Sequence, residues 1–240
     1  MRRFLIQQIE RAPKQFEFTL IGGLTGCQKT HFVKQTPNGI DLEGAAYHRG
    51  SSFGAHATPQ SNQINFENLL AIDLLAATKE QLATLVLEDE GRFIGSVDIP
   101  KDIYSKMRTS PIVVIQSDFE DRLQNVLREY VVEMQKEFAD AYPSEQAFSR
   151  FSDYLINSLA RVQKRLGLER WRAMDQSMRE ALSTQERTGD TEAHLTWIAP
   201  LLQDYYDPMY TSQLKNREEH IIFRGDQQAC REFLSSQAND

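Results

Sequence analysis

The chain has 240 residues, of which 40% are hydrophobic and 25% charged, with a net charge of −7 at pH 7. This composition is typical of a globular protein and excludes a uniformly basic nucleic-acid binder, though not a local basic patch. The chain has two cysteines and no apolar run near about 18 residues, and charged residues occur early in its N-terminal segment. We therefore expect no disulfide framework, no membrane span and no signal peptide, and a cytoplasmic location.

The first half of the chain alternates strand-like and helix-like patterns. Strands are expected where apolar and β-branched residues run together, at residues 16–21, 39–42, 83–87 and 111–116. Helices are expected where apolar residues recur every three or four positions, at residues 3–11, 30–35 and 66–77. This alternation predicts an α/β layered fold with a mainly parallel sheet.

The second half has the pattern of long amphipathic helices. We expect them at residues 119–139, 144–166, 168–182 and 192–206. Pro200 should kink or break the last of these helices, and a short strand is expected at 220–223. The predicted organisation is an α/β core at 1–118, a helical extension at 119–215, and a return strand and tail of the same domain at 216–240.

An octet typical of phosphate-binding loops follows the first predicted strand. The pattern G-x-x-x-x-G-K-[ST] is met by Gly23, Leu24, Thr25, Gly26, Cys27, Gln28, Lys29 and Thr30, except that Gln28 replaces the second glycine. Backbone N–H groups at a helix N-terminus attract anions, Lys29 adds a cation, and Thr30 offers a hydroxyl to Mg²⁺. The octet therefore predicts a P-loop NTPase-like three-layer fold. The alternative is a glycine-rich turn with an incidental lysine, which Gln28 favours by crowding the loop.

Acidic side chains end two of the predicted strands. Asp89 lies among the three acids that follow residues 83–87, and Asp41 and Glu43 end the second strand. Such positions hold Mg²⁺ or orient a water molecule, so Thr30 and Asp89 are the predicted metal ligands and Asp41 a catalytic candidate. A solvated acidic turn is the alternative. Mg²⁺ is the one cofactor expected; haem, flavin and zinc are not.

Several segments have unusual residue combinations that a fold alone does not require. They are residues 41–54, 63–68, 88–95, 164–167 and 205–210. Together they resemble the C-terminal P-loop domain of tRNA 2-selenouridine synthases, and the resemblance runs from about residue 3 to 225. That family's loop is similar to G-x-T-G-x-G-K-T, so that five positions match and Gln28 departs: the matches are Gly23, Thr25, Gly26, Lys29 and Thr30.

The resemblance implies a transferase that acts on 2-thiouridine at the wobble position of tRNA. The sulfur is geranylated from geranyl diphosphate, and selenophosphate then displaces the S-geranyl group. The family also carries a rhodanese-like domain with a catalytic cysteine, which this chain does not show. We therefore expect an excised or solitary P-loop domain, with a rhodanese domain supplied in cis or in trans. On this interpretation the loop binds the diphosphate of geranyl diphosphate or another phosphate-bearing ligand.

Candidate site residues follow from these motifs. Catalytic candidates are Lys29, Asp41, Arg49 and Asp89. Substrate or tRNA contacts are expected from His48, Arg49, Ser51, Arg92, Lys164, Arg165, Arg170, Tyr206 and Tyr210. Residues 161–172 carry five basic side chains and one acidic side chain, which suits RNA phosphates, and tyrosines stack on unpaired bases. The structural alternatives are a hydrogen-bonded turn for His48 and Arg49, ion pairing for Arg92, a solvated helix face, and tyrosines packed at a helix end.

Two other functions fit the phosphate loop. An ATP-binding small-molecule kinase or ATPase has the same fold, because fold does not determine function. A non-catalytic tRNA-binding domain would explain Gln28.

Overall fold

Five parallel strands form the centre of the computed structural model, which describes residues 2–237. In chain order they are β1 (Glu17–Gly23), β2 (Gly39–Ile40), β3 (Thr84–Glu88), β6 (Ile112–Ile115) and β7 (Ile221–Gly225). Their order in the sheet is β2-β3-β1-β6-β7, so that β1 is central and pairs with β3 and β6. The predicted α/β fold with a mainly parallel, P-loop NTPase-like sheet is confirmed.

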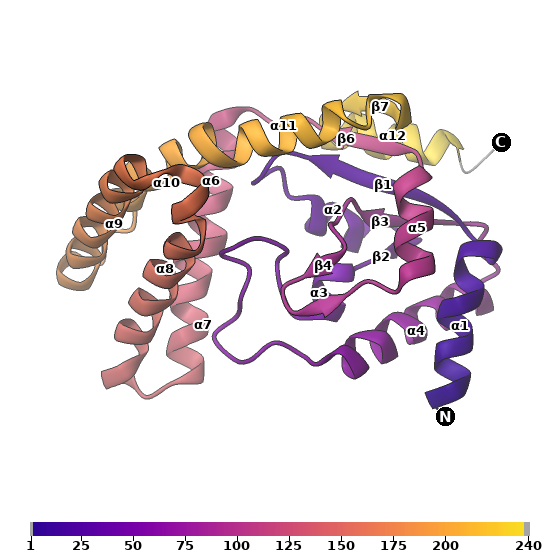
Figure 1. The fold of residues 1–240 in the computed structure, drawn as a ribbon, viewed down its shortest axis with the longest axis horizontal. Coiled ribbons are helices and arrows are strands. Elements are labelled where there is room, and N and C mark those ends of the chain that lie inside the picture. The colour runs from indigo at the N-terminus through magenta and orange to yellow at the C-terminus, as the bar shows by residue number, and fades with distance from the viewer. Residues whose placement is uncertain (1, 238–240) are drawn as a thin grey trace.

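Helices cover both faces of this sheet (Figure 1). One face packs against α1 (Arg2–Gln15), α3 (Leu42–Ala46), α4 (Gln63–Lys79) and α5 (Lys101–Thr109), and the other against α2 (Lys29–Gln35) and α12 (Gln227–Gln237). Successive strand side chains point to opposite faces, so Leu20 of β1 joins the first core and Ile21 the second. Because both faces of the central strands β1, β3 and β6 are buried, these strands are mostly apolar, which made them predictable.

Some short elements differ from expectation. The second strand ends at Ile40 instead of reaching Leu42, which begins α3. The hairpin of β4 (Phe93–Ile94) and β5 (Val97–Asp98) was not predicted, nor were α5 and α12. In α5 only Ile103 and Met107 are buried, one turn apart, which is too sparse a stripe to stand out in sequence.

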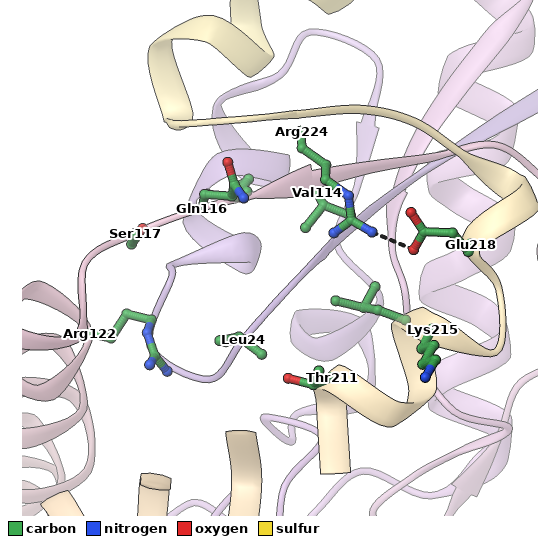
Figure 2. A pocket seen from close by; sticks show the side chains of 11 residues that line it. Leu24, Val114, Gln116, Ser117, Arg122, Thr211, Lys215, Glu218 and Arg224 are labelled. Carbon is green, nitrogen blue, oxygen red and sulfur yellow. Dashed lines mark hydrogen bonds and ion pairs between the residues drawn. The ribbon is translucent and has the colours of Figure 1, made fainter. Parts of the chain in front are cut away.

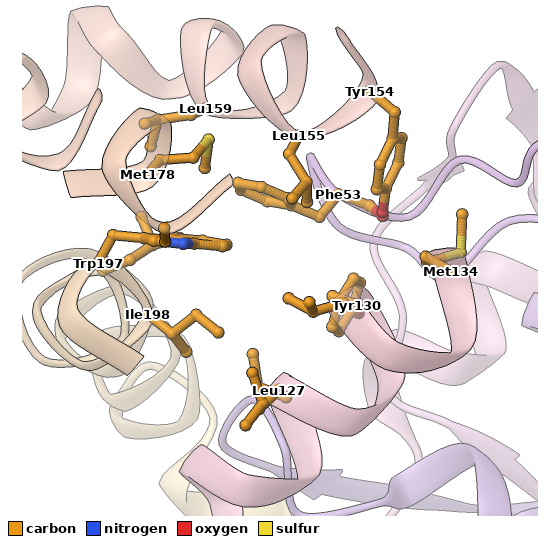
Figure 3. Packing of buried hydrophobic residues seen from close by; sticks show 14 of the residues in the cluster. Phe53, Leu127, Tyr130, Met134, Tyr154, Leu155, Leu159, Met178, Trp197 and Ile198 are labelled. Carbon is orange, nitrogen blue, oxygen red and sulfur yellow. The ribbon is translucent and has the colours of Figure 1, made fainter. Parts of the chain in front are cut away.

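A second body of helices lies between β6 and β7. It comprises α6 (Phe119–Leu127), α7 (Glu133–Ala141), α8 (Ser144–Leu166), α9 (Leu168–Thr188), α10 (Leu195–Leu201) and α11 (Asp207–Lys215), with short 3₁₀ turns at Glu192–His194 and Glu218–His220. These helices bury an apolar core of their own (Figure 3). No helix within residues 2–237 combines the length and the apolarity needed to cross a bilayer.

The segment between α3 and α4 joins the two bodies. Phe53 from this segment lies inside the helical core, where its ring stacks on Trp197 at 5.7 Å (Figure 3). The hydroxyl of Tyr154 donates a hydrogen bond to the Phe53 carbonyl. Residues 47–62 are thereby fixed between the sheet and the helices.

Two π-helical segments interrupt the helical body. Arg128–Val132 (η1) connects α6 to α7, and Leu202–Tyr206 (η3) connects α10 to α11. Pro200 was expected to break or kink its helix, but α10 continues through Pro200 and passes into η3. The α-helical hydrogen bonding therefore ends one residue after Pro200, and the chain continues as a π-helix instead of leaving the helix.

Candidate phosphate-binding site

The Gly23–Thr30 loop lies at the carboxyl edge of the sheet, where parallel α/β sheets bind ligands. Gln28 has φ 62° and ψ 40°, in the left-handed region that favours glycine. Gly26 also has a positive φ of 85°, and a Cβ there would lie 2.5 Å from the Arg122 carbonyl oxygen. The loop thus has left-handed geometry at position 28 although that residue is glutamine.

Three side chains bind successive carbonyls of the loop from outside. Arg122 Nη1 donates to the Thr25 carbonyl (3.1 Å), Asn125 Nδ2 to the Gly26 carbonyl (2.9 Å) and Gln227 Nε2 to the Cys27 carbonyl (3.2 Å). Among residues 2–237, no acceptor pairs with the backbone N–H groups of residues 28–30. The carbonyls are therefore engaged by α6 and α12 while N–H groups remain for an anion.

Arg122 is itself held by a carboxylate on another helix. Its Nη1 and Nη2 donate to Asp207 at 2.8 and 2.7 Å, and its side chain is only 5% exposed. Asp207 begins α11 directly after η3. The bidentate pair therefore connects the end of the second π segment to the phosphate loop.

Lys29 supplies the positive charge of the loop. Its Nζ donates to the Gly23 carbonyl at 3.0 Å and lies 5.4 Å from the centre of the Tyr210 ring. Burial lowers the pKa of Lys29, but the surrounding Cys27, Tyr210, Glu90 and Glu43 outweigh burial and raise it overall. The ammonium group therefore stays charged at neutral pH.

The three consecutive acids after β3 have three different environments. Glu88 is fully buried and accepts the Leu42 N–H at 3.1 Å, which ties β3 to α3. Asp89 forms an ion pair with Arg217, whose side chain is 4% exposed. Glu90 lines the cavity beside Lys29. Glu90, and not the predicted Asp89, therefore faces the loop, because Asp89 is held by Arg217.

Oxygen ligands suited to Mg²⁺ converge next to Lys29. Thr30 Oγ1 donates to Glu43 Oε2 at 2.6 Å, and a Cβ built on Gly50 would lie 2.7 Å from both Glu43 Oε1 and Glu90 Oε2. Burial raises the pKa of both carboxyl groups. No group of three or more Asp, Glu, His or Cys in the described chain is arranged to hold a metal. Thr30, Glu43 and Glu90 could hold Mg²⁺ only together with ligand phosphates and water.

A cavity of about 780 Å³ opens in front of the loop. Its walls come from the loop, α3, the 47–62 segment, η1 and α11. Arg49 lies 3.4 Å from Glu129 and 3.6 Å from Glu137, over the Tyr130 ring. Burial raises the pKa of Glu129 to about 7 despite the opposing Arg49. The cavity thus has cationic and titratable acidic groups facing one another.

The other candidates from residues 41–98 divide between cavity and scaffold. Arg49 and Ser51 line the cavity. Asp41 is the N-cap of α3 and pairs with Lys34 at 3.0 Å. His48 is buried, which lowers its pKa to about 4, and Arg92 pairs with Asp98 at 3.0 Å away from the cavity. The structure therefore brings Arg49 and Ser51, but not Asp41, Asp89 or Arg92, to the loop.

The basic residues and the tyrosines predicted to bind RNA lie in different places. Lys164, Arg165 and Arg170 are exposed near the junction of α8 and α9, outside the loop cavity. Tyr206 is buried and exchanges a 2.7 Å hydrogen bond with Ser52, so its ring packs instead of offering a free face. Tyr210 lines the cavity.

A second cavity of about 430 Å³ borders the loop at Leu24 (Figure 2). It lies between β6, β7 and α11, with apolar walls that include Val114 and Leu214. Arg224 and Glu218 form a 2.6 Å ion pair at its edge. Two of the three cations that line this cavity, Arg122 and Arg224, are already paired with carboxylates, so the cavity is less suited to a phosphate than the one beside Lys29.

Sequence reasoning missed several residues of the site. Glu90, His56 and Glu129 line the cavity, and the side chains that bind the loop carbonyls are Arg122, Asn125 and Gln227. Glu90 was one position from the predicted Asp89. The others carry no local motif, since they reach the loop only through tertiary packing.

Fold and loop together define a P-loop protein of the α/β class. The sequence matches the family described as tRNA 2-selenouridine synthase AAA domain over residues 16–240, and the chain belongs to this family. It is 44% identical to the tRNA 2-selenouridine synthase of Pseudomonas aeruginosa (strain LESB58) over 95% of the chain and 62% of that relative. The synthases of Pseudomonas putida and Cupriavidus pinatubonensis are each 43% identical, over 99% and 98% of the chain and 64% of each relative.

The chain thus spans less than two thirds of the length of these relatives. No solved structure matches it significantly.

Proposed function

We propose that this chain is the geranyl-transfer part of a tRNA 2-selenouridine synthase. The Gly23–Thr30 loop binds the diphosphate of geranyl diphosphate, and the sulfur of 2-thiouridine in tRNA attacks the allylic carbon. Selenophosphate displaces the S-geranyl group in a second step, for which a rhodanese domain acts in cis or in trans. Membership of the family supports the tRNA substrate, and the anion-binding loop supports the diphosphate.

The observation that carries the proposal is the preorganised loop with Lys29. Charge grows on the diphosphate as its bond to the allylic carbon breaks. The loop N–H groups and the Lys29 ammonium are already in place, so they stabilise that charge without rearrangement. Where Mg²⁺ is bound, Thr30, Glu43 and Glu90 would hold it, and it would neutralise part of the diphosphate charge.

An apolar cluster adjoins the cavity. Thr25, Ser51 and Tyr130 line both the cavity and this cluster, whose other members include Trp197 and Ile198. Both π segments contribute to it, through Tyr130 and Tyr206. The free space within the cluster is only about 20 Å³, so a geranyl chain would lie against its cavity-facing edge and not inside it.

The test is incubation of the protein with tRNA containing 2-thiouridine and with geranyl diphosphate, followed by mass analysis of the nucleosides. We expect S-geranyl-2-thiouridine from the wild type and at least tenfold less from Lys29→Met, because the lost ammonium weakens diphosphate binding. ATP that binds without competition from geranyl diphosphate would contradict the proposal and favour a kinase or ATPase.

A further inference from the structure

A histidine with an oriented ring lies in the wall of the loop cavity. His56 comes from the 47–62 segment, and its Nδ1 is 3.0 Å from Glu137 Oε2 on α7. Glu137 is fixed in turn by the Ala57 N–H, which donates to its Oε1 at 2.8 Å. The Tyr47 ring stacks on the imidazole at 4.1 Å with an angle of 14° between the rings. A hydrogen bond and a ring stack therefore set the orientation of His56.

These contacts also set the tautomer of the ring. A carboxylate accepts hydrogen bonds, so Nδ1 carries the proton and Nε2 carries the lone pair. Among the described residues, none is hydrogen-bonded to Nε2. Since Nδ1 is turned to Glu137, Nε2 is the nitrogen left for a ligand in the cavity.

Charged neighbours keep the imidazole neutral. Burial and the Arg49 cation lower the pKa of His56, and they outweigh Glu137, which raises it. Lys34 on α2 acts in the same direction as Arg49, and His48 is a further titratable neighbour. A neutral, oriented imidazole in a ligand cavity has the properties of a general base.

We propose that His56 is the general base of the geranyl-transfer step, with Glu137 as its positioning residue. This inference rests on the proposed function above. Alkylation of the sulfur of 2-thiouridine gives a neutral product only if the thiouracil ring also loses its N3 proton. The S–C bond forms from a sulfur electron pair, the C–O bond to diphosphate breaks with its pair leaving on oxygen, and the N3 proton moves to His56 Nε2. The imidazolium then faces Glu137, which stabilises its charge.

The experiment compares single-turnover geranyl transfer by wild type and His56→Gln, with geranyl diphosphate and 2-thiouridine tRNA saturating. We expect a loss of about 100-fold or more, since general-base catalysis contributes about 10²–10⁴-fold. Pyrophosphate and tRNA affinities should stay within about twofold. The acid limb that His56 gives to the wild-type pH–rate profile should disappear. His220→Gln is the matched control, because His220 is a half-buried histidine at the end of the 3₁₀ turn before β7.

Imidazole rescue separates catalysis from folding. Added imidazole should restore part of the rate of His56→Ala, which a purely structural role does not predict. A His56→Gln variant with the wild-type rate and pH profile overturns the base assignment alone, as does a loss of rate in His56→Ala without any rescue. A wild-type protein that transfers no geranyl group overturns the proposed function and this role with it.

Discussion

At the residue scale, substitution of Gln28 tests whether the phosphate loop is intact or impaired. Its backbone is already left-handed, at a cost of about 1–2 kcal/mol for a residue with a Cβ. Gln28→Gly should therefore raise thermal stability while pyrophosphate affinity, measured by titration calorimetry, changes by less than about threefold. Gln28→Val, which resists this conformation, should weaken binding. A gain above about tenfold in the glycine variant would show that Gln28 distorts the loop, as a non-catalytic remnant requires.

Glu129 gives anion binding a pH dependence. Its pKa of about 7 means that it gains negative charge as the pH rises from 6 to 8. Pyrophosphate affinity should fall over this range by more in the wild type than in Glu129→Gln. Ionisation of pyrophosphate itself affects both proteins equally, so it cancels when their affinities are compared at each pH. The folded chain also binds more protons than the unfolded chain between pH 4.5 and 7, so the stability due to Glu129 decreases as pH rises there. Equal pH profiles for the two proteins would remove Glu129 from the anion site.

Sequence motifs predicted a site residue only where its spacing within the motif is enough to place it in the site. Lys29 and Thr30 follow directly from the loop pattern. Asp89 and Glu90 both follow β3, and which of them faces the cavity is decided by tertiary contacts such as the ion pair between Asp89 and Arg217. His56 and Glu137 are 81 positions apart, and no sequence pattern brings them together.

At the scale of elements, α6 and α11 act on the loop through one ion pair. Asp207→Asn should leave the buried Arg122 charge unbalanced and lower the free energy of unfolding by about 2 kcal/mol, below the usual cost because Asp207 is 21% exposed. Pyrophosphate binding should weaken as well, since Arg122 also holds the Thr25 carbonyl. Chemical denaturation and calorimetry measure the two effects.

The matched control is Asp175→Asn on α9. Its partner Arg179 is 54% exposed, so the pair contributes about 0–1 kcal/mol and lies outside the loop. An Asp207→Asn variant that binds pyrophosphate like the wild type would show that the pair stabilises the helices without ordering the loop.

Helices and strands were easiest to predict where their buried apolar residues form a long, regular pattern. The buried strands and α8, with its long buried stripe, stand out in sequence. The π segments do not, because Arg128–Val132 and Leu202–Tyr206 differ from an α-helix only in hydrogen bonding. Their importance lies in the residues that they turn toward the loop, notably Glu129 and Tyr130.

At the scale of the whole molecule, the 47–62 segment unites two cores around one cavity. Phe53 anchors it in the helical core, while Arg49 and His56 face the phosphate loop. Movement of the helices would therefore shift the residues that line the loop cavity. This connection gives a physical reason why the helical body and the loop occur in one chain.

Charge distribution over the whole molecule yields a last prediction. The chain is acidic overall, yet Lys164, Arg170 and Arg172 are exposed near the α8–α9 junction, far from α1 and α4 (Figure 1). If this end meets tRNA, changing all three to Gln should weaken tRNA binding and reduce the salt slope of log K by about 2–3, because each phosphate contact contributes about 0.7–0.9.

The matched control changes three exposed lysines at the opposite end, Lys14, Lys79 and Lys101, to Gln. It alters net charge by the same amount, so a purely global effect of charge would lower the salt slope equally in both variants. A reduced slope in the first variant alone places the RNA on the α8–α9 end, where long-range attraction from a local patch outweighs repulsion by a net charge of −7. Fluorescence anisotropy of labelled tRNA between 50 and about 200 mM salt makes the comparison.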